Sequence, residues 1–174
     1  RLRIIELPVP LIYLDEKRSF GGVLDNAETR LEYYHLTLDR AIAAAFEEAL
    51  FRGYILLTFN RSGLGWLAII LTSVFFGIVH IRNPSAGSIS TLNTILAGVW
   101  FGVAYLKTRD LWFVWGMHLM WNWVQGAVFG IEVSGLTDIT TAPLLKEIDK
   151  GPTWLTGETY GIEGGIACTI AIMA

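Results

Sequence analysis

Four long apolar runs dominate the pattern of hydrophobic and polar positions from residue 41 onward. They cover roughly residues 41 to 60, 64 to 82, 89 to 106 and 111 to 131. Each run approaches the ~20 residues that a helix needs to cross ~30 Å of hydrocarbon. Short polar turns with the sequences NRSG, RNPSAG and KTRD separate the runs, and such residues favour turns. The pattern therefore predicts an all-α, polytopic transmembrane helix bundle whose core spans residues 41–131.

The segments around this core are more polar and predict no further complete span. Residues 1–40 combine a short apolar run broken by two prolines, a polar loop and a charged helical segment, and we expect them to lie beside the membrane. Residues 132–161 form a polar loop with room for a small amphipathic helix at PLLKEIDK. Residues 162–174 are apolar and indicate the start of a truncated fifth span. Because the sequence begins at Arg1 and stops within an apolar run, we expect elements to be missing at both ends.

Composition and charge strengthen the membrane interpretation and exclude other classes. The chain is 53% hydrophobic and 17% charged, far toward lipid for a soluble domain. A net charge of -3 without a basic cluster gives no reason to expect nucleic acid as a partner. The single Cys168 excludes an intrachain disulfide and is expected to be a small packed residue. Lysines and arginines flank both ends of the runs, so the orientation in the membrane stays open.

Three charged residues interrupt the first apolar run. An ionised side chain at the bilayer centre costs ~2.5 to 3.5 kcal/mol on insertion scales, so such residues are normally paired or functional. Glu48 and Arg52 stand at i and i+4, the spacing at which opposite charges meet on a helix. Glu47 is turned by ~100° from Glu48 and is less well placed for Arg52. We expect Glu48 and Arg52 to form a structural ion pair and Glu47 to face elsewhere.

The second and fourth runs add further polar groups at a similar depth. His80 lies near the end of the second run, and His118 and Asn122 stand at i and i+4 in the fourth. Histidine bonded within the core, or interhelical hydrogen bonds that hold the bundle together, would explain these residues without any function. Counting ~1.5 Å per residue along helices of alternating direction places them in the same half of the membrane as Glu47. This shared level favours a site.

The chemistry of these four groups is that of a water-activating hydrolase. A carboxylate in an apolar site can act as a general base, and a neutral histidine can help it hold a water. A second histidine and an amide can stabilise an oxyanion. The same atoms allow a zinc interpretation in which Glu47, His80 and His118 are ligands. No H-E-x-x-H motif is present, so zinc is ranked second and no cofactor is favoured.

Three motifs resemble a known family. The segments EEALFRG (47–53), FGIVH (76–80) and HLMWN (118–122) match, in order and spacing, the EExxxR, FxxxH and HxxxN motifs. These are typical of the CAAX prenyl protease and bacteriocin-processing (CPBP or Abi) family of intramembrane glutamic endopeptidases. The resemblance covers about residues 41–131.

The resemblance implies a role for each motif residue. Glu47 and His80 would activate the hydrolytic water, His118 and Asn122 would form the oxyanion hole, and Glu48 with Arg52 would hold the first helix. Phe76 would serve packing within its motif. We expect a hydrolase embedded in a bilayer, in a bacterial plasma membrane, acting on a peptide or protein substrate whose identity and lipidation stay open. A non-enzymatic immunity or scaffold protein is the alternative of another class.

Overall fold

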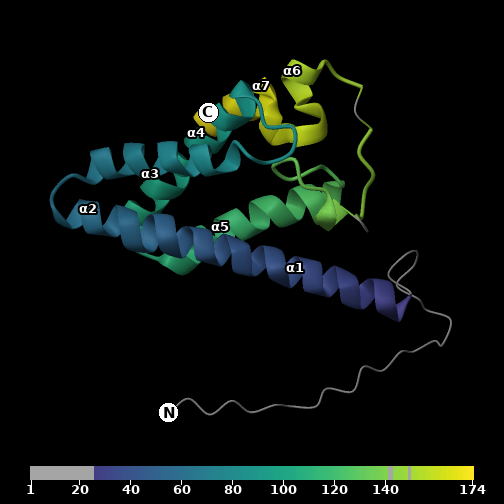
Figure 1. Cartoon of the computed structure of the whole chain (residues 1–174), viewed down its shortest axis with the longest axis horizontal. Helices are drawn as coiled ribbons and strands as arrows, with labels where there is room; N and C mark the ends of the chain where they lie inside the picture. The colour runs from purple at the N-terminus through teal and green to yellow at the C-terminus, as the bar shows by residue number, and fades with distance from the viewer. Residues whose placement is uncertain (1–25, 141–142, 149) are drawn as a thin grey trace, which may run out of the picture.

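The computed structural model describes residues 26–140, 143–148 and 150–174, and this part of the chain is helical without a β-strand (Figure 1). Helix α1 (Ala27–Glu48) continues without a break into the π-helical η2 (Ala49–Leu56) and then α2 (Leu57–Arg61). The N-cap Asn26 starts this rod, since its side chain accepts hydrogen bonds from the backbone of the first turn. The charged segment before residue 41 is therefore helical, as predicted, but it belongs to the same helix as the first apolar run.

Three further long elements complete the bundle. Helix α3 (Gly65–His80) returns beside the first rod, α4 (Ser88–Thr108) packs along α3, and α5 (Leu111–Trp123) lies against α1 (Figure 1). A second π-helical segment, η3 (Val124–Phe129), extends α5. The segment η2 begins directly after Glu48, and η3 begins two residues after Asn122. Such π-bulges occur frequently at functional sites.

Two glycines of α4 allow close contacts with neighbouring helices. A Cβ atom added at Gly98 would lie 2.9 Å from the Cα atom of Ser73 in α3. At Gly102 an added Cβ would meet Ile69 and Leu56 at 3.4 Å. The two glycines therefore allow α4 to pack closely on α3 and η2. The apolar core continues below this contact, with buried side chains from every long element: Leu56, Ala68, Ile69, Phe101, Tyr105 and Val114.

The helices suit a lipid environment, although the number of spans stays a prediction. Among the described residues, only α4 is both long and apolar enough to cross a membrane, and α3 is apolar but shorter. Large apolar side chains nevertheless stand on the outward faces, including Phe46, Trp66 and Trp112 at 68%, 74% and 76% exposure. Water would disfavour so much exposed apolar surface. The described residues form helices and no β-strand, which confirms the predicted all-α class for this part of the chain.

The polar segment after the bundle departs from the prediction. The described residues of PLLKEIDK are not helical, so the amphipathic helix expected there is wrong. The backbone N–H groups of Leu144 and Leu145 instead donate to the carbonyls of Ala127 and Val128 at the end of η3. Carbonyls at a helix end need such donors, and a segment that supplies them cannot close its own helical turns.

The last part of the chain folds back against α4. It contains short turns at Asp138–Thr140, Glu158–Tyr160 and Ile162–Gly164, a single helical turn α6 (Thr153–Thr156) and the helix α7 (Ile166–Met173). Helix α7 begins near the expected fifth span and packs on α4 (Figure 1). The predicted segment at residues 1–25 lies outside the described residues.

Candidate active site

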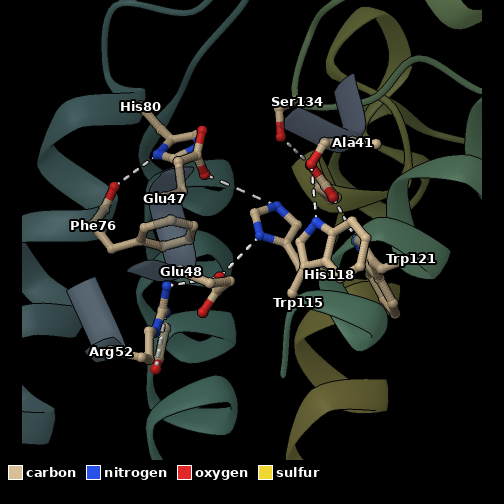
Figure 2. Close-up of polar contacts among 12 residues, drawn as sticks. Ala41, Glu47, Glu48, Arg52, Phe76, His80, Trp115, His118, Trp121 and Ser134 are labelled. Atoms are coloured by element: carbon tan, nitrogen blue, oxygen red, sulfur yellow. Dashed lines mark hydrogen bonds and ion pairs between the residues drawn. The ribbon is translucent and has the colours of Figure 1, made fainter. Parts of the chain in front are cut away.

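A fully buried ion pair joins the first motif to the third. Glu48 Oε1 accepts hydrogen bonds from Arg52 Nη1 and from His118 Nδ1, each at 2.9 Å (Figure 2). Arg52 also donates from Nη2 to the carbonyl of Gly98 at 3.3 Å. Glu48 and Arg52 are both 0% exposed. The two charges therefore lie together as expected, and the same carboxylate also anchors a histidine on α5, which the sequence pattern did not indicate.

Aromatic rings enclose this ion pair. The Arg52 guanidinium lies 4.5 Å from the ring centroid of Phe76, 5.2 Å from that of Phe101 and 5.8 Å from that of Phe51. Arginine over an aromatic face is attracted by the electrons of the ring. Phe101 also stacks on His118 at 5.2 Å between centroids. Phe76, named as a packing residue by its motif, thus forms part of the aromatic wall around the ion pair.

Glu47 faces the other side, toward the second and third motifs. Its Oε2 atom lies 4.0 Å from His80 Nε2 and 3.9 Å from His118 Nε2 (Figure 2). Among the described residues no group donates a hydrogen bond to this enclosed oxygen. A polar contact of about 4 Å suits a bridging water rather than a direct hydrogen bond. Glu47 Oε2 therefore lies where two imidazole rings converge.

The ring nitrogens of the two histidines are set by their other partners. His80 Nδ1 lies 2.7 Å from the carbonyl oxygen of Phe76, which can only accept, so Nδ1 carries the proton. In the neutral ring, Nε2 is then an acceptor facing Glu47. His118 Nδ1 likewise donates to the Glu48 carboxylate. When His118 carries both protons, its Nε2–H becomes a donor on the Glu47 side.

The site opens into a cavity of about 270 Å³, near the ~300 Å³ at which ligand pockets begin. Glu47, His80, His118 and Asn122 all line it. A second, smaller pocket adjoins it and shares three of these four residues. The remaining lining residues of the larger cavity come from α1, α3, the turn after α3 and the segment after the bundle: Arg40, Ala43, Ala44, Val79, Asn83, Val133, Ser134 and Leu136. The structure thus brings all four predicted catalytic residues to one cavity.

A further carboxylate, Glu163, was missed by the sequence reasoning. Its Oε1 accepts from Trp121 Nε1 at 2.5 Å and from Gln125 Nε2 at 3.1 Å, and its Oε2 accepts from Ser134 Oγ at 2.6 Å. It lines the smaller pocket together with Asn122. No local sequence pattern around Glu163 indicates that it lies at this pocket, because its partners come from α5, η3 and a distant turn.

The same segment buries a tyrosine. Burial raises the pKa of the Tyr160 hydroxyl, and the charge of Glu163 raises it further. Asn93 of α4 binds the backbone beneath it, donating to the carbonyls of Glu163 and Gly165 at 2.8 and 2.9 Å. The loop after the bundle is therefore fixed to both α4 and α5, and it forms one wall of the site.

The spacing of Glu47, His80 and His118 is wider than that of zinc ligands. Among the described residues, no group of three or more His, Cys, Asp and Glu side chains is placed to hold a metal ion. A tetrahedral Zn²⁺ bound at ~2.0 to 2.1 Å would hold its ligand atoms about 3.4 Å apart. Glu47 Oε2 lies 4.0 Å from His80 Nε2 and 3.9 Å from His118 Nε2. These side chains would have to move closer to serve as zinc ligands.

Comparison with known proteins places the chain in a family. A family model described as type II CAAX prenyl endopeptidase Rce1-like matches residues 31–124, more than half of the chain. Comparisons with curated proteins and with solved structures returned no match. The matched range holds all three motifs and ends just beyond Asn122, and it excludes the loop that carries Glu163. The chain belongs to the type II CAAX prenyl endopeptidase Rce1-like family.

Proposed function

We propose that this protein is an intramembrane endopeptidase that hydrolyses a peptide bond with a water held between Glu47 and His80. The observation that carries the proposal is the Glu47 Oε2 atom, which is enclosed, accepts no hydrogen bond from the described residues and lies about 4 Å from both imidazole rings. A water can lie within ~2.8 Å of both acceptors across such a gap. It would donate one hydrogen to Glu47 and the other to His80 Nε2.

The proposed reaction uses all four groups that line the cavity. Glu47 takes a proton as the water oxygen attacks the carbonyl carbon, which forms a tetrahedral intermediate. The side-chain amide of Asn122 and the Nε2–H of doubly protonated His118 donate to its oxyanion, a contribution of ~3 to 4 kcal/mol per donor in other hydrolases. The proton on Glu47 passes to the amine as the C–N bond breaks. The products are a free carboxyl group and a free amine.

The family supports a peptide or protein substrate, and its description names CAAX prenyl substrates. We extend this class to the present chain, so the substrate would be a lipidated peptide whose scissile bond reaches the cavity from the bilayer. The exposed apolar side chains of α3 and α5, such as Phe75 and Phe113, support a lipid surround. A bacterial plasma membrane remains the predicted location.

The test uses full-length protein purified in detergent and a fluorogenic prenylated peptide. Glu47→Gln and His80→Ala should each abolish cleavage, whereas the wild type should cleave the peptide. Undiminished turnover in either variant would overturn the mechanism. Absence of cleavage by the wild type, together with a loss of stability in Asn122→Ala, would support the non-enzymatic alternative, because a residue used only for packing predicts that pattern.

Metal dependence is tested on the same preparation. We propose a metal-independent reaction, so exhaustive chelation should leave the rate unchanged. Loss of activity that Zn²⁺ restores would assign the zinc mechanism to Glu47, His80 and His118 instead.

A further inference from the structure

Two carboxylates from distant parts of the chain hold the same face of α5. Glu48 of α1 accepts a hydrogen bond from His118, and Glu163 of the loop after the bundle accepts one from Trp121. These two α5 residues are three positions apart, so they are neighbours on one helical face. Figure 2 shows Trp121 on the opposite side of His118 from Arg52. The loop carboxylate is therefore a second attachment point for α5, separate from the buried ion pair.

Glu163 bridges the point where α5 changes its helix type. Its Oε1 atom accepts from Trp121 Nε1 at 2.5 Å and from Gln125 Nε2 at 3.1 Å. Trp121 belongs to α5, whereas Gln125 belongs to the π-helical η3. Since the hydrogen-bond pattern of the backbone changes from i, i+4 to i, i+5 here, a shared acceptor fixes the side chains on both sides of the change.

Asn122 stands between these two anchored residues. It lines both pockets of the site, and its side-chain amide makes no hydrogen bond to another of the described residues. The direction of the amide is therefore set by the position of the helix rather than by a side-chain partner. A donor that stabilises an oxyanion must lie ~2.7 to 3.1 Å from it. A small rotation of α5 would move the amide out of that range.

Glu163, which lies beyond the family match at residues 31–124, is itself held firmly. Its backbone carbonyl accepts from Asn93 Nδ2 at 2.8 Å, and Asn93 is 1% exposed on α4. Its second carboxylate oxygen accepts from Ser134 Oγ at 2.6 Å. The donors to its side chain among the described residues are all neutral, and hydrogen bonds to a carboxylate are roughly twice as strong as those between neutral groups. The carboxylate is thus a fixed point against which α5 is held.

We propose that Glu163 is a positioning residue that keeps the Asn122 amide directed at the oxyanion of the tetrahedral intermediate. This role rests on the proposed function, in which Asn122 stabilises that oxyanion. Glu163 acts through its hydrogen bonds to Trp121 and Gln125 and does not contact the reacting atoms. The alternative is a loop clamp, in which Glu163 only holds the wall at Ser134 in place.

The experiment measures kcat and KM of Glu163→Ala on the fluorogenic peptide, alone and combined with Asn122→Ala. A group that acts only in the transition state changes kcat and leaves KM unchanged. Glu163→Ala should therefore lower kcat by ~10- to 100-fold, a loss that a misplacement of about 1 Å can cause. In the Asn122→Ala background the amide is absent, so Glu163→Ala should lower kcat by less than ~3-fold. Single-turnover assays with enzyme in excess keep the slow rates measurable.

Three further variants serve as controls. Glu158→Ala removes a carboxylate from an exposed position of the same loop, outside both pockets of the site, and should leave kcat and KM unchanged. Glu163→Gln should keep part of the rate, because its amide oxygen can still accept from Trp121 and Gln125. If Glu163→Ala does not fold, Trp121→Phe takes its place in the same comparison, since it removes one donor to Oε1 and keeps an aromatic ring.

Nuclear magnetic resonance follows the amide itself without any cleavage. In protein with isotope-labelled asparagine, the side-chain signals of Asn122 are those lost in Asn122→Ala. Glu163→Ala should shift or broaden these signals, whereas Glu158→Ala should leave them unchanged.

The results that overturn the positioning role are distinct from failure of the proposed function. An unchanged kcat in Glu163→Ala, an equal fold loss in both backgrounds, or a rise in KM alone would make Glu163 a loop clamp while Glu47-dependent cleavage still stands. Unaltered Asn122 signals in Glu163→Ala would also overturn it. Absence of any Glu47-dependent cleavage by the wild type would refute the proposed function and, with it, the role that rests on it.

Discussion

The adjacent carboxylates Glu47 and Glu48 provide a matched pair of perturbations. The same substitution, Glu→Gln, removes one negative charge at neighbouring positions of one helix and keeps the side-chain shape. At Glu48 it changes a buried ion pair, and at Glu47 it changes an oxygen that accepts no hydrogen bond from the described residues. We expect Glu48→Gln to destabilise the fold and Glu47→Gln to stop the chemistry while leaving the fold intact.

The expected loss of folding stability in each variant follows from the burial of the replaced side chain and from its hydrogen-bond partners. Glu48 is 0% exposed and accepts from both Arg52 and His118. Removing one partner of a buried ion pair typically costs ~3 to 5 kcal/mol, because the other charge stays buried without compensation. The Glu47 side chain is 31% exposed, and substitutions away from special contacts usually change stability by less than ~0.5 kcal/mol. The two variants should therefore differ by about 3 kcal/mol or more.

The assay is equilibrium unfolding of both variants in one detergent, followed by far-UV circular dichroism, with peptide cleavage measured on the same samples. The variant Glu48→Gln/Arg52→Met adds a second check, since it leaves neither charge of the pair buried without its partner. It should recover part of the stability lost in Glu48→Gln, and the coupling isolates the pair. Equal stability of the two single variants would refute the division of roles.

Two further predictions concern packing and the loop. Gly98→Ala should destabilise the protein by ~1 to 3 kcal/mol because its Cβ would lie 2.9 Å from the Cα atom of Ser73. The helical control Gly116→Ala, where nothing lies within 4 Å, should stabilise it by ~0.5 to 1 kcal/mol; a similar loss at both positions would argue against the close contact. Glu163→Gln should loosen the loop wall, seen as faster amide exchange at Ser134 and Tyr160, since its oxygens accept three side-chain donors. Unchanged exchange there would contradict this role.

The helices and the local ion pair were accessible from the sequence because both depend on short-range spacing. Apolar runs and their turns predict where helices lie, and the i, i+4 relation alone brings Glu48 to Arg52. The convergence of His80 and His118 on Glu47 also followed from counting residues along antiparallel helices. The catalytic roles of these residues remain predictions, whereas their proximity is a property of the fold.

The remaining contacts were not accessible because they join distant parts of the chain. The His118–Glu48 hydrogen bond spans 70 positions and the Arg40–Asp138 ion pair spans 98. Neither contact can be predicted from the local periodicity of apolar and polar residues. The helix expected at PLLKEIDK failed for the same reason, since its donors are taken by carbonyls at the end of η3. Tertiary partners thus decided what local propensity left open.

His118 lies between the two carboxylates, with Nδ1 bonded to Glu48 and Nε2 facing Glu47. Glu48 accepts a hydrogen bond from Nδ1–H of His118, and Phe101 stacks on the imidazole ring. Rotation of the imidazole would break both contacts. These constraints aim Nε2 at Glu47, where the reacting carbonyl would lie. A carboxylate behind a histidine fixes its orientation and its proton in many enzyme sites. In the proposed mechanism Glu48 would therefore position His118 as well as form one half of an ion pair, and replacing it should misorient His118 even where the fold survives.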